Sequence, residues 1–344
     1  MVATATGVAV GARSGGEAET ARSDPLTARL SLRRQLGQVL VSSFDRASVP
    51  AYLRRRLRAG ETAGVILFRE NVAGGARPVT RTVQRSAHGG ALVMTDQEGG
   101  PIRTLPSAGP IPSQPAQRGP RTAGSLAVDA GRQLRAAGVN VNLAPVADLT
   151  GGPALRSRTF RGSPGLVGAK VRAAVRGYAR GRVAATAKHF PGLGAAQVNT
   201  DQGPATVPFR SDDLVPFRAA VAAQVPLVMT SHAIYPALDR GHIASQSRRI
   251  STQLLRGKLQ FGGVVITDSI EARAVIARSG VATAAERSIA AGADLVLMTG
   301  SASWKLVFPH LLRKARSSPA FRERVRTSAE RVLALKRRLG LSVR

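Results

Sequence analysis

The chain contains no cysteine, and aromatic residues make up only 4% of its 344 positions. Without cysteine there are no disulfides and no thiolate metal sites. A low aromatic content disfavours nucleic-acid binding by base stacking. No apolar run approaches the roughly 20 residues that a membrane-spanning helix needs. These absences leave a globular protein without a membrane span as the expected class.

Acidic residues are also scarce, since 20 Asp and Glu stand against 50 Lys and Arg, a net charge of +30. Such a balance often indicates binding to nucleic acid or to anionic surfaces. Here the arginines are scattered among small residues, and only residues 54–56 and the C-terminal stretch form clusters. No recognisable nucleic-acid motif is present. We therefore attribute the charge to the arginine bias of a GC-rich genome and expect non-specific adhesion to polyanions but no specific nucleic-acid partner.

The ends of the chain suggest one domain with an extension. Residues 1–25 are rich in Gly, Ala and Ser and lack helical periodicity, so we expect a flexible tail. The weakly apolar residues 2–10 lack the basic and apolar regions of a signal peptide, which favours a cytoplasmic protein. We expect residues 26–344 to form a single domain that ends in a basic helix over 321–337, and we expect a monomer.

Short apolar runs alternate with longer amphipathic segments along the domain. Most of the runs are continuously apolar, as is typical of parallel strands that are covered on both faces. Eight such strand and helix units predict an α/β fold, the (β/α)8 TIM barrel, with a doubly wound open sheet as the alternative. The eight runs are 38–41, 64–68, 91–94, 139–143, 183–187, 226–229, 263–266 and 293–298. The helices expected between them are 45–59, 122–137, 165–180, 211–223, 251–260 and 281–291, with Ser211 and Ser251 as N-caps.

Charged and polar residues follow five of these runs, and the run 183–187 leads directly into Lys188 and His189. Burying one such group without a partner costs several kcal/mol, so five at equivalent positions indicate a shared site rather than a stabilising role. In a TIM barrel this site lies at the carboxyl ends of the strands. The residues concerned are Asp96, Asp148, Lys188 with His189, His232 and Asp268.

Carboxylates flanked by cations suit sugar chemistry, because hydroxyls need both acceptors and donors and glycosidic cleavage needs two groups that act on the bond. Asp96 is the expected acceptor, and Lys188, His189 and Arg158 are the expected donors. The glycines match neither the Walker nor the dinucleotide fingerprint, so we expect no cofactor. A metal site built from His189, His232 and Asp268 is a weaker alternative, because the histidines lack helical ligand spacing.

These segments together resemble the N-terminal barrel of glycoside hydrolase family 3, in particular its single-domain β-N-acetylhexosaminidases. The resemblance implies retaining hydrolysis of exo-β-glycosides of N-acetylglucosamine, in cell-wall turnover, with Asp268 as nucleophile. It also implies that Asp96, Arg158, Lys188, His189 and His232 hold the sugar. The matching segments span roughly residues 35 to 300 and are 96–100, 140–148, 188–192, 228–239, 261–268 and 290–294.

The chain departs from that family pattern at the expected proton donor. Asp201 stands where the N-acetylhexosaminidases have the acid/base histidine, and Asn199 replaces its aspartate partner. A carboxylic acid with a raised pKa can transfer the same proton, so Asp201 is either the acid/base or a solvated loop carboxylate. Arg103 is shifted by one position from a family arginine that binds substrate, and Arg161 replaces a glycine. A β-glucosidase and a catalytically impaired sugar-binding barrel therefore stay open as alternatives.

Overall fold

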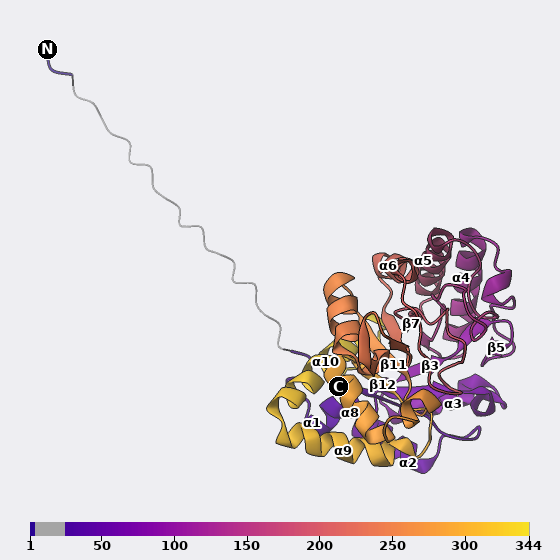
Figure 1. Cartoon of the computed structure of the whole chain (residues 1–344). Coiled ribbons are helices and arrows are strands. Elements are labelled where there is room, and N and C mark those ends of the chain that lie inside the picture. The colour runs from indigo at the N-terminus through magenta and orange to yellow at the C-terminus, as the bar shows by residue number, and fades with distance from the viewer. Residues whose placement is uncertain (4–24, 344) are drawn as a thin grey trace.

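The computed structural model describes residues 1–3 and 25–343, and its centre is a closed barrel of eight parallel strands surrounded by helices (Figure 1). The first strand closes the barrel by pairing with the last, which places Leu40 beside Val296. Each of the eight predicted apolar runs supplies one strand, so the TIM barrel is confirmed. In barrel order the strands are β1 (Leu40–Ser42), β2 (Gly64–Leu67), β3 (Leu92–Thr95), β6 (Val141–Asn142), β7 (Ala184–Phe190), β8 (Leu227–Thr230), β11 (Val264–Ser269) and β12 (Leu295–Leu297).

Helices cover the outside of the barrel, and two short hairpins stand apart from it. The hairpins are β4 (Gln97–Gly99) with β5 (Ile102–Arg103), and β9 (Ile234–Tyr235) with β10 (Asp239–Ile243). The α-helices are α1 (Leu32–Gly37), α2 (Ala51–Ala59), α3 (Ala76–Ser86), α4 (Pro120–Ala136), α5 (Pro164–Arg180), α6 (Val215–Ala222), α7 (Arg273–Ile276), α8 (Val281–Ala291), α9 (Ser303–Ser317) and α10 (Pro319–Arg338). The short 3-10 helices are η1 (Arg69–Val72), η2 (Gln114–Ala116), η3 (Ser211–Leu214) and η4 (Ala244–Gln246), and η5 (Arg249–Lys258) is a π-helix.

Several predicted helix boundaries are wrong, and the predicted tail lies almost wholly in residues 4–24, outside the described part of the chain. The helix expected from residue 45 begins at Ala51, because Pro50 disfavours helical backbone in the residue before it. Ser211 is not an N-cap; instead the Asp213 carboxylate accepts a hydrogen bond from the backbone N–H of Arg210. Ser251 lies inside η5, and its hydroxyl donates to the carbonyl oxygen of Ala244.

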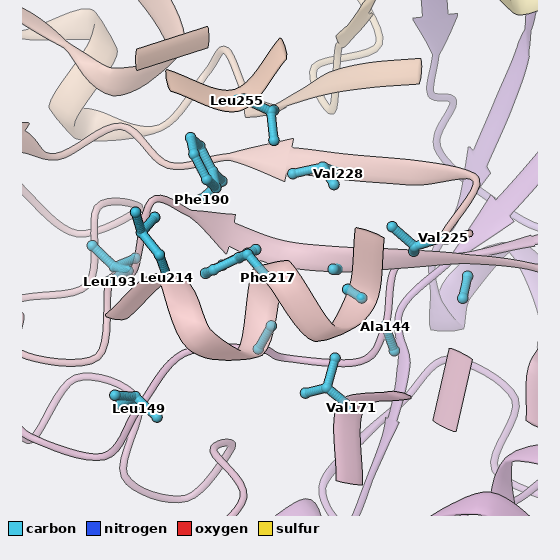
Figure 2. Close-up of a cluster of buried hydrophobic side chains, with 14 of the residues drawn as sticks. Ala144, Leu149, Val171, Phe190, Leu193, Leu214, Phe217, Val225, Val228 and Leu255 are labelled. Atoms are coloured by element: carbon cyan, nitrogen blue, oxygen red, sulfur yellow. The ribbon is translucent and has the colours of Figure 1, made fainter. Parts of the chain in front are cut away.

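The carboxyl end of β7 is anchored by the largest buried apolar cluster. Phe190, the last residue of β7, packs edge to face against Phe217 of α6, with ring centroids 5.2 Å apart. Figure 2 shows Leu193 and Leu214 beside this pair, where α6 covers β7. Burying aromatic rings supplies much of the free energy of a core. The residues just before Phe190 are thereby held in place, and they are Lys188 and His189.

The other end of the barrel is closed by α10, the predicted basic C-terminal helix. Val332 and Leu335 of this helix join the apolar cluster that fills the barrel. That cluster includes Leu92, Leu227 and Leu295, the first residues of their strands, so the contact lies at the amino-terminal ends. Burying one leucine contributes about 1.5–3 kcal/mol. The helix therefore seals the barrel below its core.

Candidate active site

A cavity of about 770 Å³ opens at the carboxyl ends of the strands, as expected for a TIM barrel. Its walls come from the ends of several strands, among them β2, β3, β7, β11 and β12, and from the loops that follow the strands. Seven of the eight predicted site residues line this cavity, so the structure brings them together from distant parts of the chain. They are Asp96, Arg103, Arg158, Lys188, His189, Asp201 and Asp268.

One wall of the cavity is a buried ion cluster centred on Glu98, which the sequence analysis did not assign to the site. Arg158 donates to both carboxylate oxygens of Glu98, with Nε–Oε2 at 3.0 Å and Nη2–Oε1 at 2.7 Å. Lys188 Nζ lies 2.6 Å from Glu98 Oε1 and 2.6 Å from Asp96 Oδ1. Glu98 follows Asp96 at a spacing of two, which in an extended segment indicates the same face. That spacing is the signal by which Glu98 could have been found.

Paired charges keep this cluster ionised despite its burial. Burial by itself raises the pKa of Glu98, but the charges and hydrogen bonds of Arg158 and Lys188 outweigh it and hold this pKa well below its usual range. Burial lowers the pKa of Lys188, yet Asp96 and Glu98 raise it by more. Asp96 is the most exposed member, with 29% of its side chain accessible against 3% for Lys188. Asp96 therefore presents a carboxylate to the cavity and is held in place by its ion pair with Lys188.

Asp268 lies at the carboxyl end of β11, one residue before its last, and stands beside His189, the predicted sugar-binding histidine. His189 Nε2 lies 3.8 Å from Asp268 Oδ2, and the backbone N–H of Ser269 donates to Asp268 Oδ1 at 2.8 Å. Burial raises the pKa of Asp268, but His189, His232, Lys188 and the Ser269 N–H lower it by more, so the pKa is below its usual value. An ionised carboxylate in this position is suited to attack an electron-poor carbon.

Asp201 lies on the loop after β7, and its pKa is displaced in the opposite direction to that of Asp268. Its backbone carbonyl oxygen accepts from Arg273 N, and that of Thr200 accepts from Ala274 N, so this loop is held against the segment that follows Asp268. Burial of the carboxyl group and the charge of Asp268 raise the pKa of Asp201 to about 6. Although Asp201 as a residue is exposed, its carboxyl group faces the cavity and a like charge. Two carboxyl groups with opposite pKa displacements are typical of an acid and a nucleophile.

His232 is the predicted site residue that the structure does not place in the cavity. It is 1% exposed, and both ring nitrogens are engaged, Nδ1 with Ser245 Oγ and Nε2 with the carbonyl oxygen of Ser269, each at 2.8 Å. Burial lowers the pKa of this histidine. His232 therefore supports the segment after Asp268 from behind and does not line the cavity, and its expected contact with sugar stays a prediction.

Arg103 lines the cavity, but its guanidinium is largely engaged by its own loop. Nε donates to the carbonyl oxygen of Gly100 at 3.0 Å, and Nη1 donates to that of Pro106 at 2.8 Å. Arg69 donates to the carbonyl oxygens of Pro101 and Arg103, which ties the same loop to η1. Arg103 thus shapes the rim, and only the part of its guanidinium not used in these bonds faces a ligand.

A metal ion would need several ligating side chains close together. Within residues 1–3 and 25–343, no group of three or more His, Asp or Glu side chains is arranged to hold a metal ion. The weaker alternative of a metal site from His189, His232 and Asp268 is thus not favoured by the geometry.

None of the helices described here has the length and apolar character that a membrane span requires. The expected monomer, the cytoplasmic location and the lack of a nucleic-acid partner stay predictions.

The sequence of the chain matches a known protein family and several of its members. A family model described as the glycosyl hydrolase family 3 N-terminal domain matches residues 31–335. An uncharacterized secreted glycosyl hydrolase of Arthroderma benhamiae is 32% identical over 337 residues, which cover 90% of this chain and 95% of that protein. A β-hexosaminidase of Xanthomonas oryzae pv. oryzae is 33% identical over 260 residues, or 70% of this chain and 78% of that protein.

Two solved structures extend the likeness to three dimensions. A glycoside hydrolase family 3 β-N-acetylglucosaminidase from Paenibacillus superposes with a TM-score of 0.85 at 32% identity over 90% of this chain, which spans only 63% of the Paenibacillus chain. A β-N-acetylhexosaminidase from Beutenbergia cavernae superposes with a TM-score of 0.81 at 30% identity, covering 90% of this chain and 99% of that one.

The barrel, its carboxylate-lined cavity and these matches define the class of the protein, which is a glycoside hydrolase. Within that class, the chain belongs to glycosyl hydrolase family 3, and the matched region covers most of its length. The resemblance drawn from the sequence motifs is thereby confirmed.

Proposed function

We propose that the protein is a retaining exo-β-N-acetylhexosaminidase that releases N-acetylglucosamine from cell-wall fragments. The reaction is carried by one observation: Asp268, with a lowered pKa, and Asp201, with a pKa raised to about 6, line the same cavity. The sugar is supported by the two relatives described as a β-N-acetylglucosaminidase and a β-N-acetylhexosaminidase. The proposal includes a role in peptidoglycan turnover, because N-acetylglucosamine is a component of that polymer.

In the first step, an oxygen of the Asp268 carboxylate bonds to the anomeric carbon while the bond from that carbon to the leaving oxygen breaks. The Asp201 carboxylic acid gives its proton to the leaving oxygen, and the aglycone departs as an alcohol. A covalent glycosyl-enzyme remains. The lowered pKa of Asp268 keeps the nucleophile ionised, and the raised pKa of Asp201 keeps a proton available.

In the second step, the Asp201 carboxylate takes a proton from water while the water oxygen bonds to the anomeric carbon. The bond to Asp268 breaks, and both carboxyl groups return to their starting states. Two inversions give overall retention of configuration. Asp96, Lys188 and Arg158 take no part in these transfers; they hold the sugar hydroxyls, so that binding energy fixes the reacting carbon next to Asp268.

The test combines a substrate panel with covalent trapping. Aryl β-glycosides of N-acetylglucosamine and of glucose distinguish the proposed sugar specificity from a β-glucosidase by the ratio of kcat/KM. A 5-fluoro glycoside of the preferred sugar should then leave an adduct that peptide mass spectrometry places on Asp268. Asp268→Asn is the control and should show none. An adduct on another residue would refute the assignment of Asp268, and binding without turnover of any glycoside would leave a sugar-binding barrel.

A further inference from the structure

Asp148 is a buried carboxylate just outside the cavity, and nothing in the proposed reaction uses it. It is 0% exposed, and it accepts hydrogen bonds from two backbone N–H groups and one imidazole nitrogen. Among residues 1–3 and 25–343, no lysine or arginine forms an ion pair with this carboxylate. Burying a charge that no such cation balances costs free energy, which indicates that the contacts of Asp148 serve a function.

The first contact of Asp148 orients the ring of His189. Asp148 Oδ2 lies 2.8 Å from His189 Nδ1, and the backbone N–H of His189 donates to the same carboxylate at 3.1 Å. An ionised carboxylate can only accept, so the hydrogen bond requires a proton on Nδ1. Nε2 is then the nitrogen that faces Asp268, 3.8 Å away. Asp148 thus selects which ring nitrogen the cavity sees.

The second contact fixes the start of the loop that carries Asp201. The backbone N–H of Leu193 donates to Asp148 Oδ1 at 2.6 Å, and Leu193 O accepts from Ala196 N at 2.9 Å. The loop also runs close to the segment after Asp148, since a Cβ on Gly194 would lie 1.5 Å from the carbonyl oxygen of Leu149. One carboxylate therefore sets the position of both His189 and the approach to Asp201.

We propose that Asp148 is a positioning residue for the hydrolytic reaction. It holds His189 with Nε2 toward Asp268, and it keeps the loop of Asp201 in register with that pair. The proposal rests on the proposed roles of Asp268 and Asp201. It concerns a residue that touches no substrate, because Asp148 does not line the cavity.

The test is Asp148→Asn, which keeps the size of the side chain but replaces one acceptor oxygen with an NH2 donor. The three donors around position 148 cannot all be satisfied by one carbonyl oxygen, and the amide NH2 favours the His189 tautomer that bears its proton on Nε2. We expect kcat/KM to fall by about 100-fold or more, as when the orienting aspartate of a catalytic triad is replaced. The acid limb of the pH profile should also move to higher pH, because an amide in place of the carboxylate favours the uncharged ring, and the charge of His189 is the largest of the effects that lower the pKa of Asp268.

Asp239→Asn is the matched control. Asp239 is also a buried carboxylate that contacts a histidine, with His242 Nδ1 at 3.2 Å, and it also accepts from a backbone N–H, that of Gly241. Neither residue of this pair lines the cavity. We expect the control to lose stability while its kcat/KM and its pH profile stay those of the unaltered enzyme. An equal effect on both variants, or an unmoved acid limb in Asp148→Asn, would overturn the proposal.

A measurement on the unaltered protein keeps the proposal testable if Asp148→Asn does not fold. The chain has five histidines, so the ¹⁵N signals of His189 can be assigned by comparison with His189→Gln. In the neutral ring the proton should lie on Nδ1, and a neutral ring with its proton on Nε2 would refute the inference. The fluoro-sugar adduct on Asp268 separates the two ideas: no adduct refutes the proposed function, whereas an adduct together with an unprotonated Nδ1 refutes only the role of Asp148.

Discussion

The pKa of Asp201 sets the pH at which the enzyme should lose activity. As a general acid, Asp201 acts only while protonated. With a pKa of about 6, roughly nine-tenths of it is protonated at pH 5 and about a tenth at pH 7. We therefore expect kcat/KM to fall about tenfold between these pH values. Because the two carboxyl groups interact, the measured limbs belong to the pair of Asp201 and Asp268.

The direction of each limb follows from the state that each group needs. Asp268 must be ionised, and its pKa lies below the usual value, so the acid limb should appear below about pH 4. Asp201 must be protonated, so activity declines as the pH rises through about 6. The full profile is then a bell whose alkaline side reports Asp201. An alkaline limb near pH 8 would contradict this account.

The variant Asp201→Asn separates the acid from other sources of the alkaline limb. General acid catalysis contributes about 100- to 10,000-fold, so activity on glycosides with poor leaving groups should fall by that factor. A 2,4-dinitrophenyl glycoside needs no proton on its leaving group, so its first step should be nearly unchanged and azide should accelerate the second. Asp212→Asn, at an exposed aspartate of η3 that does not line the cavity, is the control. Equal activity of Asp201→Asn and the control on every substrate would refute the assignment.

Two further predictions concern stability. Glu98→Gln removes the charge between Arg158 and Lys188, and breaking this buried pair should lower the free energy of unfolding by about 3–5 kcal/mol in urea denaturation. The control Glu323→Gln, at an exposed pair, should lower it by less than about 1 kcal/mol. Equal losses in the two variants would contradict this reading. Burial lowers the pKa of Lys336 from 10.5 to about 7. Between pH 7 and 10 the unfolded chain therefore keeps a proton on this amine that the folded protein has released. Because the unfolded state binds more protons there, the melting temperature should rise with pH over this range. Lys336→Met should remove that rise, and an unchanged rise in the variant would count against the buried-amine explanation.

The fold could be predicted from the sequence because its signal is local. Apolar runs, most of them continuous, marked all eight barrel strands, and the segment 281–291 is α8 to the residue. Of the four described α-helices without a prediction, which are α1, α3, α7 and α9, two contain a proline: Pro78 in α3 and Pro309 in α9. Proline disfavours a helix in general, but Pro78 lies in the first turn of α3, where its missing N–H costs nothing.

The site could be predicted only as far as the strand ends determine it. Lys188, His189 and Asp268 follow directly from that rule, because parallel strands bring their carboxyl ends to one rim. His232 obeys the same rule but turns away from the cavity toward Ser245, a residue 13 positions further on. Glu98 depends on Arg158, 60 positions further on. Contacts between such distant positions leave no local pattern in a single sequence.

Side chains fill the barrel interior and α10 covers its amino-terminal ends, so no passage runs from the pocket through the barrel. A polysaccharide cannot thread through a packed barrel, so for the exo-acting enzyme proposed above we expect the terminal sugar of a chain to occupy the pocket. The released monosaccharide must leave by the same route by which the next chain end arrives. Free sugar should therefore compete with substrate, and the enzyme should let go of the polymer after every cut.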